Sequence, residues 1–160
     1  RIWSAGASIG AEIYSISILL KETKVTPALL LATDLDESVL KKARAGIYLV
    51  NQVSGISAHY LKKYFTERED GQWVLHDSIK SPVVFKRHDL LKDRYERNFD
   101  LILCRNVFIY FTSDTQSRLI TNFMDSLNHG GYFIVGSAEQ IMDPARYGLE
   151  RVSYCIYQKS

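Results

Sequence analysis

Short apolar runs alternate along this chain with segments of helical periodicity, and this alternation predicts strands and helices in turn. The run over residues 28–33 is continuously apolar, which is typical of a parallel strand buried on both faces of a sheet, and further mostly apolar strand-like runs cover residues 1–5, 99–104 and 132–136. Helical segments lie between them, at residues 13–20, 37–45 and 113–127. The pattern therefore predicts an α/β fold built on a mostly parallel sheet.

The first strand leads into a turn of small residues with two glycines, Gly6 and Gly10, and the turn leads directly into a helix. Glycine lets backbone N–H groups approach a ligand, and the positive end of the helix dipole points to the same place. The spacing differs from the G-x-G-x-x-G of dinucleotide-binding proteins, and no phosphate-loop lysine follows. This unit favours a nucleotide-like ligand, with a tight turn that binds nothing as the alternative.

Two aspartates follow the second apolar run, Asp34 and Asp36. A carboxylate at the carboxyl end of a parallel strand can accept two hydrogen bonds from a ribose diol. An aspartate at the same place can instead cap the next helix. We predict that Asp34 binds the ligand, that Asp36 caps the helix over residues 37–45, and that Gly46 ends that helix.

Asp89 closes another short strand and could accept a hydrogen bond from an exocyclic amine such as adenine N6. A turn aspartate without a ligand is the alternative. Arg87 and His88 are interpreted as solvated loop residues. The other histidines, at positions 59, 76 and 129, have no partners with the spacing of a metal site, so no metal is expected.

The strand over residues 99–104 delivers two polar residues, Arg105 and Asn106, which an aromatic run follows. The carboxyl end of a fourth strand is a second place where open α/β sheets carry chemistry. The helix that follows is predicted to begin at Thr112 or Ser113 and to bury one apolar face, formed by Leu119, Ile120, Phe123, Met124 and Leu127.

Residues 47–87 are less regular. Tyr60 to Phe65 is spaced like a short amphipathic helix, and residues 72–75 and 83–86 are predicted to pair as a small antiparallel hairpin. The exposed edge of such a hairpin could bind a peptide as an added strand, or the hairpin could be a plain structural flap. Nearer the end, residues 128–131 are predicted to form a turn, and residues 150–157 alternate like a single antiparallel edge strand.

Composition and charge narrow the class of protein. The 160 residues are 46% hydrophobic and 24% charged, which suits one cored domain. A net charge of +2 gives no sign of nucleic-acid binding, and no apolar run approaches the roughly 20 residues of a membrane span. Cys104 and Cys155 lie in apolar runs and are expected to be reduced, so a cytoplasmic location is predicted. Because the chain opens on a strand at Arg1, we expect it to be part of a longer protein.

Several segments, in order and with matching spacing, resemble the CheR family of chemotaxis receptor methyltransferases. The most specific are Cys104-Arg105-Asn106-Val107-Phe108-Ile109-Tyr110-Phe111 and Ala43-Arg44-Ala45-Gly46-Ile47-Tyr48. Weaker matches include Trp3-Ser4-Ala5-Gly6, Ala32-Thr33-Asp34-Leu35-Asp36 and Gly130-Gly131-Tyr132-Phe133. The similarity covers nearly the whole chain.

The resemblance implies a Rossmann-like class I methyltransferase fold over residues 1–160, with a seven-stranded sheet whose last strand is antiparallel. It implies a β-subdomain insert at about residues 66–87, which in some members grips a receptor's C-terminal tail, and the absence of the family's N-terminal helical domain. The implied activity is transfer of a methyl group from S-adenosylmethionine to glutamate carboxylates of methyl-accepting chemotaxis receptors. We expect a monomer without nucleic-acid or membrane partners.

The resemblance also assigns roles to single residues of this chain. It implies that Ala5, Gly6 and Glu12 line the methionine end of the cofactor and that Asp34 holds the ribose. It further implies that Asp89 and Leu90 contact adenine. The catalytic residues implied at the methyl-transfer site are Asn106, which also contacts the cofactor, Tyr110 and Arg105.

Some positions depart from the family's pattern. Its first loop usually is Gly-Cys-Ser-Thr-Gly-Glu-Glu-Pro-Tyr-Ser, whereas this chain has Gly6-Ala7-Ser8-Ile9-Gly10-Ala11-Glu12-Ile13-Tyr14-Ser15. The chain also has Asp89 where Asn is usual, and Gly136-Ser137-Ala138-Glu139 where Gly-His-Ser-Glu is usual. Losing a carboxylate beside the cofactor would weaken binding by about 1 to 3 kcal/mol if that contact is buried.

Two rival functions remain at this point. The altered loop supports a catalytically weak or inactive module that binds the cofactor or scaffolds signalling proteins. A nicotinamide-dependent oxidoreductase would share the glycine loop and Asp34, but its glycine spacing is different and it has no place for the Cys-Arg-Asn run. Methyl transfer to a glutamate, which is ionised near pH 7, needs no general base, and the sequence shows no nucleophile and base pair.

Overall fold

A computed structural model describes all residues from Arg1 to Ser160. Its main feature is a seven-stranded sheet with the strand order β6-β2-β1-β7-β8-β10-β9. In chain order these strands are β1 (Ile2–Ala5), β2 (Leu30–Asp34), β6 (Val83–Arg87), β7 (Phe99–Cys104), β8 (Leu127–Val135), β9 (Leu149–Ser153) and β10 (Ile156–Lys159). The first five are parallel to one another, whereas β10 is antiparallel to both of its neighbours. The predicted fold class is confirmed.

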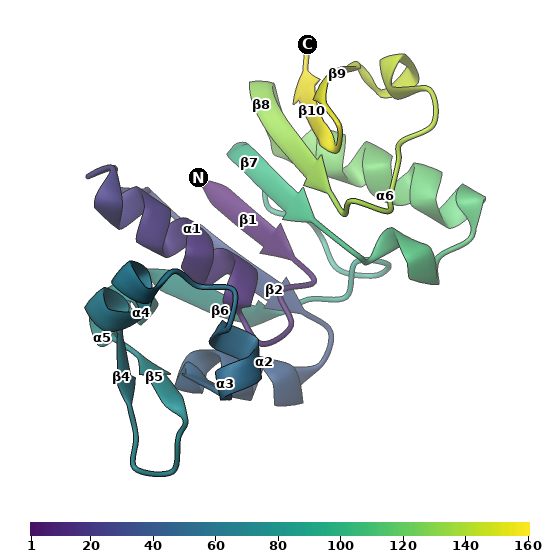
Figure 1. Ribbon diagram of the computed structural model, residues 1–160. Helices are drawn as coiled ribbons and strands as arrows, with labels where there is room; N and C mark the ends of the chain where they lie inside the picture. The colour runs from purple at the N-terminus through teal and green to yellow at the C-terminus, as the bar shows by residue number, and fades with distance from the viewer.

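Helices connect the parallel strands and cover both faces of the sheet, as parallel crossovers require. α1 (Ala11–Glu22) and α2 (Glu37–Ala45) follow β1 and β2, and α6 (Ser113–Ser126) follows β7. Figure 1 shows α1 and α6 on opposite faces of the sheet. None of the helices has both the length and the apolar character that crossing a membrane requires.

The two faces of the sheet bury separate apolar clusters. On the α6 side, Trp3 is 1% exposed and packs against Phe99 and Phe123, with ring centroids 5.4 and 5.3 Å away. Its indole nitrogen donates to the Thr33 hydroxyl at 2.9 Å, so β1 is held to β2 by a side chain as well as by the ladder. On the α1 side, Ile13 packs with residues of β2 and of the segment between β2 and β6. The sheet is therefore a rigid base whose strand ends are fixed in space.

The caps of α2 form as predicted. The Asp36 carboxylate accepts a hydrogen bond from the Ser38 N–H at 2.7 Å, and hydrogen bonding by the side chain and then the N–H of Ser38 lowers the pKa of Asp36. Gly46 ends the helix with φ at 62°, a left-handed conformation that favours glycine. The predicted apolar face of α6 is confirmed for Leu119, Ile120, Phe123 and Met124, which are all buried, whereas Leu127 is buried as the first residue of β8.

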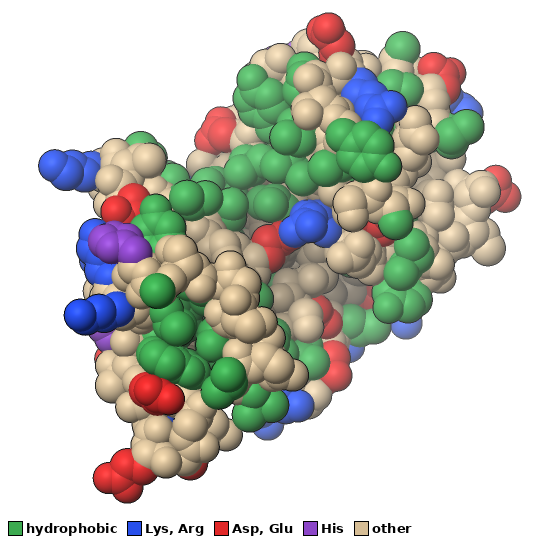
Figure 2. All heavy atoms as spheres, viewed as in Figure 1, with side chains coloured by type: hydrophobic (Ala, Val, Ile, Leu, Met, Phe, Trp, Pro, Cys, Tyr) green, Lys and Arg blue, Asp and Glu red, His purple; other side chains and the backbone are tan.

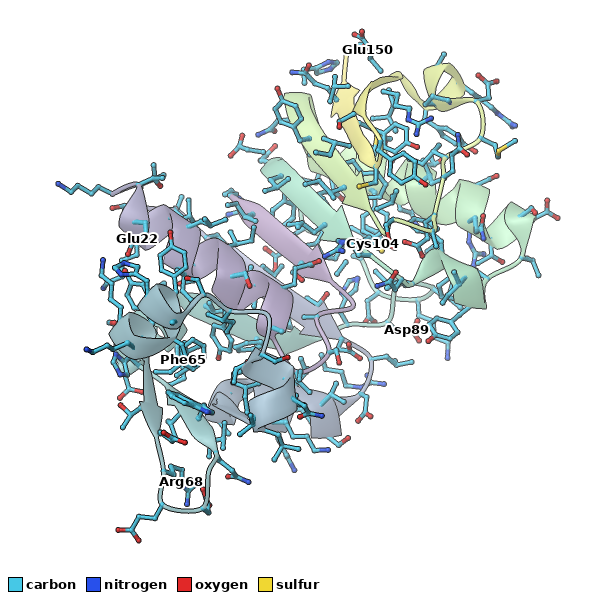
Figure 3. All side chains as sticks on the ribbon, in the orientation of Figure 1. Glu22, Phe65, Arg68, Asp89, Cys104 and Glu150 are labelled. Atoms are coloured by element: carbon cyan, nitrogen blue, oxygen red, sulfur yellow. The ribbon has the colours of Figure 1, made fainter.

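A small three-stranded antiparallel sheet projects from the main body (Figure 1). It comprises β3 (Ile47–Tyr48), β4 (Phe65–Glu67) and β5 (Trp73–Leu75), with β5 in the centre. Short helices surround it, namely α3 (Val50–Val53), α4 (Ala58–Tyr64) and α5 (Asp77–Lys80). Figure 3 labels Phe65 at the base of the β4–β5 hairpin and Arg68 near its tip.

This sheet corrects the predicted hairpin. The expected partner of residues 72–75 was residues 83–86, but β5 pairs with β4 and β3 instead, and β6 joins the main sheet in parallel with β2. The antiparallel insert therefore comprises residues between Ile47 and Leu75, not residues 66–87. α5 separates β5 from β6 and turns the chain back to the main sheet.

Two predictions near the carboxyl terminus are also wrong. Residues 128–131 belong to β8, where Gly130 with φ at 74° and a shift of register against β7 absorb the extra residues as a bulge. Residues 150–157 form no single strand, because the chain turns at Tyr154 and Cys155 and returns as β10. β10 lies between β8 and β9, so the edge strand is β9.

Candidate functional site

A cleft of about 840 Å³ opens at the carboxyl ends of β1, β2, β6 and β7. This is the edge of an open α/β sheet at which ligands bind. Figure 2 shows a hollow in this region, with acidic and basic side chains beside it. The lining residues come from four separate loops, over residues 6–15, 33–35, 88–91 and 105–111.

The glycine loop shapes the first wall of the cleft. Gly6 has φ at 77°, and the Gly6 and Ala7 N–H groups both donate to the Thr33 carbonyl, at 2.9 and 2.8 Å. A Cβ atom on Gly6 would lie 2.5 Å from Cγ2 of Val107, so a side chain here would push the β7 loop away. Glycine at this position therefore lets the ends of β1 and β7 close on the same space.

Glu12 lies in the first turn of α1 and faces the cleft. Its Oε1 accepts a hydrogen bond from the Ser4 hydroxyl at 2.7 Å, and its Oε2 lies 3.3 Å from Nη1 of Arg105. The carboxylate of Glu12 is mostly buried and the guanidinium of Arg105 is nearly half exposed. This ion pair links the glycine loop to the loop after β7, across the floor of the cleft.

Asp34 ends β2, and the main chain fixes the position of its carboxylate. The Ser8 N–H donates to Oδ2 at 2.9 Å, and the Asp36 N–H donates to Oδ1 at 3.0 Å. An ionised carboxylate can accept about four hydrogen bonds, so each oxygen keeps a lone pair for a ligand. The structure thus separates the two aspartates as predicted, with Asp36 at the helix cap and Asp34 at the cleft.

Asp89 and Leu90 follow β6 and form the opposite end of the cleft; Asp89 is labelled in Figure 3. The Leu91 N–H donates to Oδ1 of Asp89 at 2.9 Å, and the Leu90 carbonyl accepts from the Tyr95 hydroxyl at 2.9 Å. The interpretation of His88 as a solvated loop residue is wrong, because its side chain is 6% exposed and packs against Trp3.

The loop after β7 carries Arg105, Asn106 and Tyr110 to the cleft. Asn106 has φ at 57°, which is uncommon for a residue other than glycine. Tyr110 lies in a short 3₁₀ helix and is 78% exposed, so its hydroxyl is free to meet a molecule entering the cleft. Cys104, just before this loop, is fully buried, and burial raises the pKa of its thiol, so it offers no thiolate nucleophile (Figure 3).

Of the nine residues predicted for the site, the structure brings eight to this one cleft: Gly6, Glu12, Asp34, Asp89, Leu90, Arg105, Asn106 and Tyr110. Ala5 is 1% exposed within β1 and does not line the cleft. Sequence reasoning assigned no role to Glu139, whose buried carboxylate accepts hydrogen bonds from the Asn106 and Phe108 N–H groups. Two signals were available: an acidic residue shortly after a buried strand, and the match of Glu139 to the glutamate of the family's Gly-His-Ser-Glu.

No three or more His, Cys, Asp or Glu side chains gather where they could hold a metal ion. The donors and acceptors at the cleft are instead carboxylates, backbone groups and one guanidinium. A nucleotide-like organic ligand suits this set.

The model of the CheR methyltransferase SAM-binding domain matches residues 1–154. The chain belongs to the CheR family. It is 40% identical over 161 residues to a chemotaxis protein methyltransferase of Listeria innocua, an alignment that covers 100% of this chain and 61% of the relative. Identity to chemotaxis protein methyltransferase 1 of Pseudomonas aeruginosa is 34% over 164 residues, covering 96% of this chain and 60% of the relative. The chain thus spans about three fifths of these curated relatives.

Solved structures share the fold of this CheR domain. A TehB-like SAM-dependent methyltransferase from Corynebacterium glutamicum superposes with a TM-score of 0.60 at 17% identity, covering 99% of this chain and 79% of that protein. The CMeT domain of the citrinin polyketide synthase superposes with a TM-score of 0.54 at 19% identity, covering 84% of this chain and 28% of that protein. At these identities the likeness shows the fold alone.

Membership of the CheR family makes S-adenosylmethionine the cofactor, and the cleft fits it. The cofactor has a positive sulfonium and ammonium and one negative carboxylate. The cleft presents three carboxylates, from Glu12, Asp34 and Asp89, against the one guanidinium of Arg105. Its net negative charge therefore complements a cation. Glu12 would hold the ammonium of the methionine end, and Asp34 the ribose hydroxyls.

Proposed function

We propose that residues 1–160 form the catalytic domain of a protein-glutamate O-methyltransferase that methylates chemoreceptors during chemotaxis adaptation. The observation that carries the proposal is the position of Arg105, Asn106 and Tyr110, which lie on one loop beside the cofactor cleft and reach solvent. The relatives are named chemotaxis protein methyltransferases, which supports a role in chemotaxis.

The charges at the cleft suit transfer to a carboxylate. When bound, S-adenosylmethionine supplies an electrophilic methyl group on a positive sulfur. An acceptor glutamate is already ionised near pH 7, so the chain has no proton to remove. Arg105 can bind the incoming carboxylate, and the Tyr110 hydroxyl can donate to its second oxygen. These two contacts would align the acceptor oxygen, and alignment is the main contribution that the chain makes to the rate.

The altered glycine loop favours a second candidate, a CheR-type module that binds the cofactor without turnover. Ile9 and Ala11 line the cleft at positions where the resemblance implies threonine and glutamate. A cofactor would then meet two fewer polar groups. Binding without methyl transfer would distinguish this module from the enzyme.

The test is methyl transfer by the full-length protein from labelled S-adenosylmethionine to cytoplasmic fragments of chemoreceptors. Carboxyl methyl esters release their label in mild base, which identifies a carboxylate as the acceptor, and peptide mapping then shows whether it is a glutamate. We expect Tyr110→Phe to lower the transfer rate by about tenfold, the value of one hydrogen bond to a charged group. Tyr132→Phe, on an exposed part of β8, is the matched control.

Unchanged transfer by Tyr110→Phe would exclude a role for its hydroxyl. Failure of the wild-type protein to place base-labile label on receptor glutamates, while it still binds the cofactor, would contradict the proposed activity in favour of the binding module.

A further inference from the structure

Glu139 is a buried acid that does not line the cofactor cleft. Its side chain is 8% exposed, and it takes part in none of the chain's ion pairs. Burying a carboxylate is costly unless it is hydrogen-bonded, so its partners show what holds it there. All of them are main-chain N–H groups.

Three N–H groups converge on this carboxylate. Oε2 accepts from Asn106 at 2.8 Å and from Gly136 at 2.7 Å, and Oε1 accepts from Phe108 at 2.9 Å. Asn106 and Phe108 follow β7, whereas Gly136 follows β8. Glu139 therefore ties the ends of two neighbouring strands to one point, and it fixes the first half of the loop that carries Arg105 and Tyr110.

Gly136 leaves room for this arrangement. A Cβ atom there would lie 2.5 Å from Oδ1 of Asn106 and 2.7 Å from Oε2 of Glu139. The hydrogen bond from the Asn106 N–H to Glu139 helps to hold Asn106 in its left-handed conformation, which costs free energy unless neighbouring groups impose it. The left-handed conformation of Asn106 and the three hydrogen bonds of Glu139 therefore belong to one local structure.

Gln116 of α6 holds the second half of the same loop. Its side-chain amide donates to the Phe108 carbonyl at 2.9 Å and to the Phe111 carbonyl at 3.1 Å. Glu139 and Gln116 line a single small cavity of about 160 Å³ behind the loop. Glu139, which accepts from N–H groups, and Gln116, which donates to carbonyls, thus hold residues 106–111 from two different segments of the chain.

We infer that Glu139 and Gln116 are positioning residues, which act through the loop that they grip and set the place of Arg105 and Tyr110 toward the acceptor. The effect on the rate of receptor methylation rests on the proposed function. The cofactor is expected to depend on them less, because Glu12, Asp34 and Asp89 come from other loops. Displacement of a reacting group by about 1 Å can lower a rate by about 100-fold.

The experiment compares Glu139→Gln and Gln116→Leu in the full-length protein. Glutamine keeps the size of Glu139, but its amide nitrogen cannot accept a hydrogen bond, so at least one of the three N–H groups loses its partner. Leucine at position 116 removes both donors. Gln140→Leu is the matched control, because exposed Gln140 lines the same cavity and makes no hydrogen bond to the loop.

Both variants are expected to lower kcat for receptor methylation by about tenfold or more, with the Kd for S-adenosylhomocysteine changed by less than about threefold. Hydrogen exchange of the amides of residues 106–111 should become faster in both, and Gln140→Leu should match the wild type. Unchanged kcat and unchanged exchange would overturn the inference. So would an equal loss of cofactor affinity and kcat together with a lower Tm, which would indicate general structural support.

The exchange measurement separates this inference from the proposed function. If the wild-type protein binds S-adenosylhomocysteine but methylates no receptor, the proposed function fails. Faster exchange confined to residues 106–111 would then still support the grip on the loop, and unchanged exchange would overturn it.

Discussion

His88 is a buried imidazole at the edge of the cofactor cleft. It makes edge contacts with Trp3 and Tyr95, with ring centroids 5.6 and 5.2 Å away, and its Nε2 has no hydrogen-bond partner. Burial lowers its pKa, although the nearby Asp93 carboxylate acts in the opposite direction. The folded protein therefore keeps His88 neutral at pH values where the unfolded chain is protonated.

This difference predicts a pH dependence of stability. Above about pH 7.5, one unit above the ordinary pKa of histidine, His88 is neutral in both states and the stability no longer depends on its titration. As the pH falls below this value, only the unfolded state takes up the proton, so the free energy of unfolding decreases by up to about 1.4 kcal/mol per pH unit until the lower folded pKa is reached. Urea denaturation between pH 7.5 and 5.5 measures the decrease, and His88→Phe should make it smaller. An equal decrease in wild type and variant would contradict the assignment.

Single residues were predicted from sequence only where local chemistry decides their role. Asp36 and Gly46 cap α2 as expected, because cap geometry depends on neighbouring residues. The place of His88 depends on Trp3 and Tyr95, which come from separate segments. The role of Glu139 depends on N–H groups about 30 residues earlier in the chain. No local pattern shows such partners.

At the scale of elements, the small sheet contacts the cofactor loop through Tyr48. This residue of β3 is 5% exposed, and its hydroxyl donates to the Ile9 carbonyl at 3.0 Å. Ile9 lies between the two glycines of the loop that borders the cleft. The antiparallel insert therefore helps to hold the cofactor loop from outside the cleft.

Removing this hydroxyl is expected to weaken cofactor binding. Tyr48→Phe leaves the part-buried Ile9 carbonyl without its donor, a loss of about 0.5 to 1.5 kcal/mol, so the Kd for S-adenosylhomocysteine should rise about two- to tenfold. Tyr60→Phe in α4 is the control, because the Tyr60 hydroxyl makes no hydrogen bond in the structure. Equal affinity of Tyr48→Phe and wild type, measured by calorimetry, would show that the contact does not stabilise the loop.

Pairing between elements was harder to predict than their existence. The apolar run at β6 was recognised, but its nearness to β5 in sequence favoured a hairpin, whereas its true partner β2 lies some fifty residues earlier. The turn between β9 and β10 has Tyr154 and Cys155 in place of the usual Gly or Asn, so the alternation continues through it unbroken.

At the scale of the molecule, the site could be predicted because a parallel sheet brings its carboxyl strand ends together. Asp34, Asp89 and Arg105 are far apart in sequence, yet each follows a strand of the same sheet and each lines the same cleft. The resemblance to the CheR family supplied the cofactor, and the family match confirms it. What the strand order alone could not show is the support behind the cleft, which Tyr48 gives to the glycine loop and Glu139 and Gln116 give to the loop after β7.

The most direct test of this account is calorimetric titration of the protein with S-adenosylhomocysteine, in wild type and in Asp34→Ala. Asp125→Ala, an exposed aspartate at the far end of α6, is the control. We expect one binding site in wild type and control, and affinity at least about tenfold lower in Asp34→Ala, which loses charge-assisted bonds to the ribose. No binding by the wild type, or equal affinity in Asp34→Ala, would contradict the assignment of this cleft to the cofactor.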